Sequence, residues 1–155
     1  MIKILKIDFP NEKATICRTI LRNLPNWFGI ESFIKKYVDE SKTMPFFTAI
    51  HNKAAVGFVS MKIHNAYTAE IYVMGILQKY QRQGIGKELI KCCELFCKDN
   101  QIEYLTVKTL DESAKIPDYE KTRNFYLLMK FRPLEVFPLI WDKNNPCLLM
   151  AKFFK

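Results

Sequence analysis

The sequence lacks long apolar runs, a paired cysteine pattern and blocks of like charge, and each absence excludes a class of protein. No apolar run approaches the ~18 residues of a membrane-spanning helix, and the alternating segment Met1–Pro10 lacks the apolar block of a signal peptide. The five cysteines are odd in number, and their spacing indicates neither a disulfide framework nor a zinc site. We therefore expect a cytoplasmic protein with no membrane partner, metal or disulfide.

The net charge of +8 attracts anionic partners without identifying them. The lysines are scattered, and no run of five or six like charges occurs. Nucleic-acid binding needs basic residues concentrated on one helix with aromatic residues between them, and only Lys87, Lys91 and Lys98 line up. Nucleic acid is thus disfavoured as a partner, while a homodimer stays open.

Residues 1–155 are expected to form a single domain, because the chain can bury one core and is too short for two domains. A helix capped by Asn11 is expected to end before Pro25. Periodicity predicts further helices at 31–41, 84–98 and 119–129, and strands at 2–8, 46–50, 56–63, 69–77, 104–110, 134–140 and 148–154. This order predicts an α/β fold with a mixed, mostly antiparallel central sheet flanked by helices.

The strand at 69–77 precedes the most informative segment of the chain. Simple alternation places Ile71 and Val73 on one of its faces and Glu70 on the other. Gly75 lies late in the strand, where a glycine indicates a bulge or a close approach to the backbone.

A glycine-containing turn, Gln81–Lys87, follows this strand and opens a helix. Unpaired N–H groups and the positive end of the helix dipole together bind phosphate at such a place. Gly84 and Gly86 permit close approach, and Arg82 and Lys87 add positive charge. The third glycine of the dinucleotide fingerprint is missing and no Gly-Lys-Ser/Thr follows, so Rossmann and P-loop nucleotide sites are both disfavoured.

Three segments resemble the Gcn5-related N-acetyltransferase (GNAT) family. Gln81-Arg-Gln-Gly-Ile-Gly86 matches the family signature Gln/Arg-x-x-Gly-x-Gly/Ala, Glu70–Ile76 resembles its central strand, and Asn124–Phe131 resembles its last helix end. The resemblance covers about the C-terminal two-thirds of the chain, and the first 45 residues match only in helical character. It implies the acyl-CoA N-acyltransferase fold.

The implied activity is transfer of the acetyl group of acetyl-CoA to a primary amine, by direct attack in a ternary complex. The acceptor amine would belong to a small molecule, or to a protein N-terminus or lysine. A noncatalytic acyl-CoA-binding sensor module is the alternative from a different class.

The resemblance also implies where acetyl-CoA binds. It would lie where the strand 69–77 splays from the strand 104–110. Its pantetheine arm would pair with backbone groups of the strand, and its pyrophosphate would be held by the turn. The implied cofactor-binding residues are Met74, Gly75, Ile76, Gln81, Arg82, Gln83, Gly84, Ile85, Gly86 and Lys87.

Two residues are catalytic candidates by resemblance. Tyr126 matches the tyrosine that protonates the leaving sulfur. The alternative is a purely structural role, in which its hydroxyl anchors the helix. Glu70, fourteen residues before Gly84, lies where some members carry a general base, although a strand carboxylate could also pair with a nearby lysine. His51 and His64 fall at expected turns, where solvent exposure is typical, and receive no role.

The chain departs from the family pattern at two positions. Lys130 replaces the usual glycine after the last helix, and a side chain in a left-handed cap costs about 1 kcal/mol. Tyr119 stands where many members have an asparagine that touches the cofactor. Trp27 and Trp141 lie where the family builds its acceptor site, although core packing is the more usual function of a tryptophan.

Overall fold

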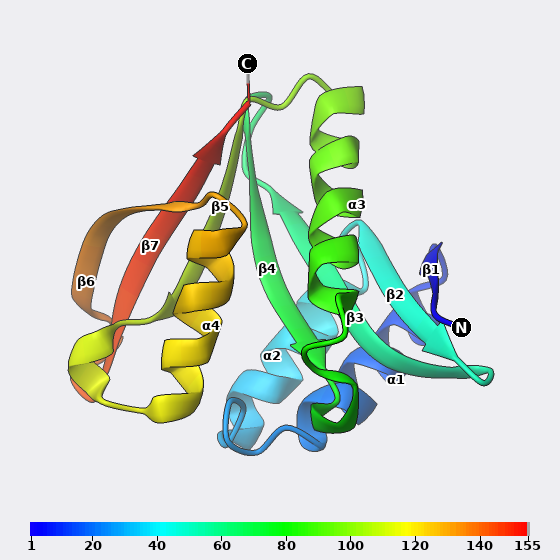
Figure 1. The fold of residues 1–155 in the computed structure, drawn as a ribbon, viewed down its shortest axis with the longest axis horizontal. Coiled ribbons are helices and arrows are strands. Elements are labelled where there is room, and N and C mark those ends of the chain that lie inside the picture. Colours follow the sequence, from blue (N-terminus) through cyan, green and yellow to red (C-terminus); the bar gives the residue numbers. More distant parts are fainter. Residues whose placement is uncertain (155) are drawn as a thin grey trace.

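The computed structural model describes residues 1–154, which form a seven-stranded sheet with helices on both faces. The strand order is β1-β2-β3-β4-β5-β7-β6, and every neighbouring pair is antiparallel except β4–β5. Figure 1 shows α3 and α4 in front of the sheet and α1 and α2 behind it. The predicted mixed, mostly antiparallel α/β fold and its element order are thus confirmed. The elements are β1 (Lys3–Lys6), α1 (Pro10–Arg22), α2 (Glu31–Ser41), β2 (Phe46–His51), β3 (Ala54–Ile63), β4 (Thr68–Ile76), α3 (Ile85–Asp99), β5 (Tyr104–Leu110), α4 (Pro117–Leu128), β6 (Arg132–Asp142) and β7 (Asn145–Phe153).

Two helices begin earlier than the sequence indicated, and for the same reason. α1 starts at Pro10 with Phe9 at the N-cap, so the predicted cap at Asn11 is wrong. α4 starts at Pro117, which the sequence had placed in a loop before Tyr119. Proline suits the first helical position because that position needs no N–H donor and the ring presets the helical φ.

Each face of the sheet carries its own core. The α3–α4 core includes Ile85, Leu89, Cys93, Leu105 and Met150, all at most 3% exposed. On the opposite face, the α1–α2 core includes Ile20, Leu21, Ile34, Phe46 and Phe58. Among the described residues, no helix is long and apolar enough to cross a membrane.

Four of the five cysteines act as small buried side chains. Cys17, Cys93, Cys97 and Cys147 are buried, and all five thiols are free. Burial raises the pKa of Cys147 to about 11, with Lys108 opposing and Glu70 adding to the effect. At neutral pH its sulfur is therefore a thiol and not a reactive thiolate.

A bulge in β4 changes which face of the sheet its side chains point to. Ser60 of β3 pairs with Val73, but the next residue, Met61, pairs with Ile71, so Tyr72 is the extra residue. As a result Ile71 packs in the α3–α4 core and Val73 in the α1–α2 core. The expectation that both share one face is wrong, because simple alternation does not include an inserted residue.

Gly75 in β4 marks a close approach of α1. It lies opposite Phe58 of β3 in regular register. A Cβ there would stand 3.1 Å from Leu24 and 3.2 Å from Ile20. Of the two possibilities that the sequence left open, the close approach holds at this position, and the bulge lies nearby at Tyr72.

The C-terminal end of α4 is closed by a Schellman motif. The Phe131 N–H donates to the Tyr126 carbonyl at 3.0 Å and the Lys130 N–H to the Leu127 carbonyl at 3.0 Å. The rings of Tyr126 and Phe131 add the usual apolar contact, with centroids 5.5 Å apart. Lys130 adopts φ 75°, which confirms the expected left-handed cap occupied by a non-glycine residue.

Replacing Lys130 by glycine is expected to stabilise the protein. Glycine removes the strain of a side chain at positive φ, worth about 1 kcal/mol, and for a chain of this size that raises Tm by roughly 2–4 °C. Thermal unfolding of Lys130→Gly beside a Lys130→Ala control measures it, because alanine keeps the strain. Equal Tm values for the two variants would contradict the strain argument.

Candidate active site

The sheet opens between its two parallel strands. β4 and β5 pair only from Thr68↔Tyr104 to Ile71↔Val107. Beyond that point β4 stays paired with β3 and β5 with β7, so the two strands diverge, as Figure 1 shows below their meeting point. We call this V-shaped gap the splay, and its position agrees with the one expected from the sequence.

Backbone groups of β4 point into the splay. The Leu77 N–H donates to the Val56 carbonyl of β3 at 2.9 Å. Antiparallel ladders alternate between bonded and non-bonded pairs, so Met74 and Ile76 direct their N–H and C=O groups away from β3. The Gln81 side chain donates to the Ile76 carbonyl at 2.9 Å and fixes the following turn to the end of β4. An extended ligand in the splay would therefore meet backbone donors and acceptors.

The turn Gln81–Lys87 forms a concave end to α3. Arg82 has φ 61° and Gly84 has φ 85°, two left-handed conformations that curl the backbone. Gly84 is the N-cap without a side-chain cap, and the first helical bond runs from the Glu88 N–H to its carbonyl at 3.1 Å. The N–H groups of the first turn thus face outward from the helix end, where an anion binds. The Gln83 side chain is exposed. Its Nε2 donates to the Lys79 carbonyl at 3.2 Å, in the short 3₁₀ helix Gln78–Tyr80 that precedes the turn.

The remaining turn residues have separate tasks. Ile85 is buried in the α3–α4 core and fixes the start of the helix. A Cβ on Gly86 would stand 3.0 Å from the Phe125 ring, so its absence lets α4 pack close to this end of α3. Arg82 and Lys87 are exposed. Arg82 and Lys87 therefore place positive charge at the rim of the turn, while Gly86 lets α3 and α4 pack closely.

Tyr126 lies on α4 within the α3–α4 core. It is 5% exposed and packs edge-on against Phe125 and Phe131, with centroids 5.3 and 5.5 Å away. Burial raises its pKa above the usual value of a tyrosine, and Cys93 and Tyr119 add smaller effects. The phenol is thus fully protonated at neutral pH, the state that a proton donor requires.

Glu70 lies on β4 just before the splay opens and is 4% exposed. The Lys108 ammonium of β5 is 3.3 Å from both of its carboxylate oxygens, and His64 Nε2 is 2.7 Å from Oε1. The predicted lysine pairing is thus present, but His64 was missed. The hairpin register contained a signal, because Lys62 lies opposite Glu70 and places residue 64 on the same face two positions away.

Comparison with known proteins agrees with this geometry. The sequence profile of the acetyltransferase (GNAT) family matches residues 9–125, which include the splay, the turn and Glu70. The chain belongs to the acetyltransferase (GNAT) family. Its activity is acetyl transfer from acetyl-CoA to an acceptor substrate. The match starts well before residue 45, where the sequence had offered only helical character.

Solved structures show the same GNAT fold over the whole chain. A GNAT-family protein from Desulfovibrio desulfuricans has TM-score 0.81 and 16% identity, with 99% of both chains covered. A GNAT acetyltransferase from Elizabethkingia anophelis with acetyl-CoA bound has TM-score 0.67 and 20% identity, covering 99% of this chain and 98% of the other. PaiA N-acetyltransferase from Thermoplasma acidophilum in complex with coenzyme A has TM-score 0.72 and 16% identity, covering 98% and 99%. No curated protein matches the sequence.

The residues of the splay fit the cofactor of this GNAT chain. The outward N–H groups at the start of α3 suit a pyrophosphate, and the strand-like groups of Met74 and Ile76 suit the amides of a pantetheine arm. Among the described residues, Thr109 on β5 carries a buried hydroxyl without a hydrogen-bond partner. Thr109 lies two residues beyond the last β4–β5 pair, and an orphaned buried hydroxyl costs about 1–3 kcal/mol, a cost that a polar ligand within hydrogen-bond distance would remove.

Tyr119, at the GNAT asparagine position, forms a contact within the chain. Its hydroxyl donates to the Trp27 carbonyl at 2.6 Å, and the Trp27 Nε1–H donates to the Thr122 hydroxyl at 3.2 Å. The α1–α2 loop is thereby tied to α4 across the splay, and Trp27 also packs against the α1–α2 core. Trp141 is 36% exposed on β6, so core packing does not explain it.

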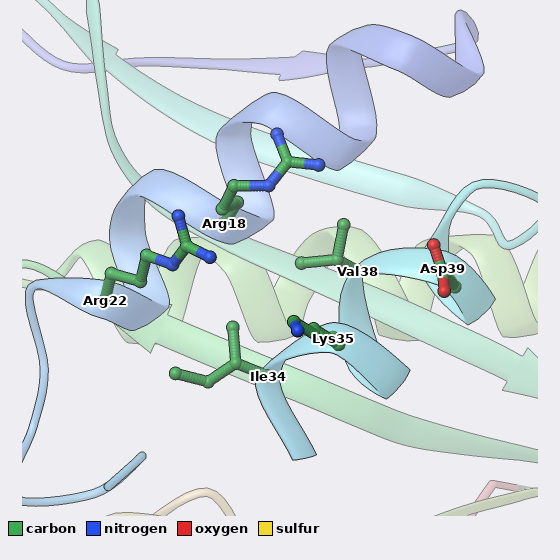
Figure 2. Close-up of a pocket in the computed structure, with 6 residues that line it drawn as sticks. All are labelled: Arg18, Arg22, Ile34, Lys35, Val38 and Asp39. Atoms are coloured by element: carbon green, nitrogen blue, oxygen red, sulfur yellow. The ribbon is translucent and has the colours of Figure 1, made fainter. Parts of the chain in front are cut away.

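Two surface hollows lie apart from the splay. Figure 2 shows one of about 280 Å³ between α1 and α2, where Arg18, Arg22 and Lys35 surround the apolar side chains of Ile34 and Val38. The other, of about 650 Å³, is lined by the β5–α4 loop, α4 and the β6–β7 hairpin. Because neither is lined by β4 or by the glycine turn, the splay remains the candidate active site.

Proposed function

We propose that this acetyltransferase transfers the acetyl group to a primary amine, by direct attack while both substrates are bound. The observation that carries the proposal is the splay itself. It has a phosphate-binding turn at one end and the Glu70 carboxylate at the other, with Tyr126 on the helix that packs beside it. A small-molecule amine is favoured slightly over a protein N-terminus or lysine.

Binding of acetyl-CoA is assigned to the residues implied by the family motif. Backbone N–H groups from Arg82 to Lys87 hold the pyrophosphate, with the two basic side chains at the rim. Met74 and Ile76 pair with the pantetheine arm, and Gly75 leaves the space that α1 fills. Acetyl-CoA supplies the acetyl group as a thioester, whose carbonyl an amine can attack.

Proton transfer is assigned to the two catalytic candidates. Glu70 removes a proton from the acceptor ammonium, directly or through a water, because only the neutral amine is a nucleophile. Tyr126 donates its phenolic proton to the departing sulfur. Glu70 belongs to β4, just before the splay opens, and Tyr126 to α4, so in this proposal the two side chains act on different atoms of the reaction.

The test is coenzyme A thiol release from acetyl-CoA in the presence of a panel of amines and matched alcohols. We expect primary amines to accelerate release at least tenfold over the rate without acceptor, and mass spectrometry to show N-acetyl products. Acceleration by alcohols alone would contradict the amine assignment. Cofactor binding without acceleration by any acceptor would favour the noncatalytic sensor module.

A further inference from the structure

An ion pair stands at the point where the splay begins. Ile71↔Val107 is the last β4–β5 pair, and Glu70 and Lys108 flank it on opposite strands. The Lys108 ammonium lies 3.3 Å from both carboxylate oxygens, and its side chain remains 31% exposed. We call Glu70 and Lys108 the apex ion pair. A cation therefore stands directly beside the candidate base.

A second carboxylate near the apex ion pair, Glu40, already has a partner. His64 approaches Glu70, and the Tyr72 hydroxyl donates to Glu40. A further cation, Lys62, stands 5.7 Å from the Tyr72 ring centroid. A polyamine needs a second free carboxylate for its second charge, and like charges brought together are repelled. This balance favours an acceptor that carries a negative group close to its amine.

Aromatic rings adjoin the same place. The rings of Phe28 and Tyr37 meet edge-on with centroids 6.0 Å apart, and those of Tyr37 and Tyr72 meet with centroids 5.3 Å apart. These rings from α2, β4 and the loop before α2 pack with the α1–α2 core, on the face of the sheet that carries the Tyr72 bulge. They offer apolar surface to a substituent on the acceptor.

From these contacts we infer that the acceptor is a free α-amino acid, an inference that rests on the proposed amine acetylation. Its nitrogen and carboxyl carbon are about 2.5 Å apart by standard bond lengths. The charged atoms of the apex ion pair are 3.3 Å apart, so one amino acid can reach both residues. The ammonium of the amino acid docks at Glu70 and its carboxylate docks at Lys108. Each charge of the amino acid then faces an opposite charge of the protein.

The reaction then balances as follows. Glu70 takes one proton from the ammonium, the amine nitrogen forms a bond to the acetyl carbon, and the carbon–sulfur bond breaks. The sulfur receives the Tyr126 proton, and the second amine proton returns the phenol to its neutral state. The products are an N-acetylamino acid and coenzyme A, with one proton released to solvent by Glu70.

The first test compares matched acceptors on the wild-type enzyme. L-Phenylalanine and L-methionine are measured against their amides, phenethylamine and spermidine. We expect kcat/KM to be about tenfold to a hundredfold higher for each free acid than for its amide, the range of one charge-assisted hydrogen bond. The amide has the less basic amine and is more often neutral, so amine reactivity alone predicts the opposite order.

Variants assign the preference to Lys108. In Lys108→Met the acid-to-amide ratio is expected to fall close to one, through a higher acceptor KM with an unchanged KM for acetyl-CoA. Lys108→Arg keeps the charge and is expected to keep the preference. Lys62→Met is the matched control, because Lys62 lies opposite Glu70 in the hairpin register but contacts Tyr72 instead.

Each outcome decides between the two proposals. Equal use of acids and amides, or better use of spermidine, overturns the amino-acid acceptor and leaves amine acetylation standing. If none of the tested amines is acetylated, the proposed function itself is overturned. If Lys108→Met is inactive with every acceptor, the wild-type and Lys108→Arg ratios decide, and loss of preference in Lys62→Met transfers the role to that residue.

Discussion

Tyr126→Phe is expected to lower kcat about a hundredfold to ten-thousandfold, the usual contribution of a general acid. Only the hydroxyl is lost, and the ring keeps its packing against Phe125 and Phe131. The KM for acetyl-CoA and the Tm should therefore change little. Steady-state thiol release and calorimetry on the same preparations measure these quantities.

The pH dependence gives an independent check on Tyr126. Burial raises its pKa, so the proton that it donates is present throughout the neutral range and is lost only above the pKa. Wild-type kcat should thus show no decline assignable to this group up to about pH 10, the ordinary pKa of tyrosine. Tyr104→Phe is the control, because Tyr104 is 43% exposed on β5 before the splay. Full kcat in Tyr126→Phe would leave this residue with a packing role only.

Glu70→Gln is expected to lower kcat about a hundredfold, because the amide cannot accept the amine proton. Glutamine keeps the size of the side chain. Lys108 loses its counter-charge, but with 31% of its side chain exposed it can turn toward water, so the loss of stability should be modest. The measurement is kcat against pH with one fixed amine, together with Tm.

A second ion pair of the same kind separates catalysis from stability. Glu94 on α3 and Lys152 on β7 lie 2.6 Å apart and are both mostly shielded from solvent. Lys152 pairs with Leu105, where β5 is still paired with β4, so this ion pair lies away from the splay. Glu94→Gln should lower Tm about as much as Glu70→Gln and leave kcat near the wild-type value. Equal activity losses in both variants would show that Glu70 acts only through the fold.

Local features of the fold followed from the sequence because they depend on neighbouring residues. Alternating and helical periods gave every α-helix and strand in the correct order, and the left-handed cap at Lys130 was expected from the resemblance to the GNAT family. The starts of α1 and α4 were misplaced, since Pro10 and Pro117 can begin a helix as well as precede one. The Tyr72 bulge left no signal, because an extra residue in β4 only shows in the pairing with β3.

The candidate site divides in the same way. The turn Gln81–Lys87 and its phosphate-binding geometry could be predicted because its glycines, its basic residues and the following helix are contiguous in sequence. Which lysine pairs with Glu70 could not be predicted. Its hairpin neighbour Lys62 is opposite in register, yet Lys108 forms the ion pair, because the parallel crossover brings β5 beside β4.

The sequence by itself determined the α/β class, the element order and the position of the glycine turn at the start of α3, because each depends on short-range patterns and on a contiguous motif. Only the tertiary structure decided where the splay begins, which lysine faces Glu70, and that Tyr119 binds the Trp27 loop. Those features join residues that lie 38 to 92 positions apart, and their contacts depend on how helices and strands pack in space.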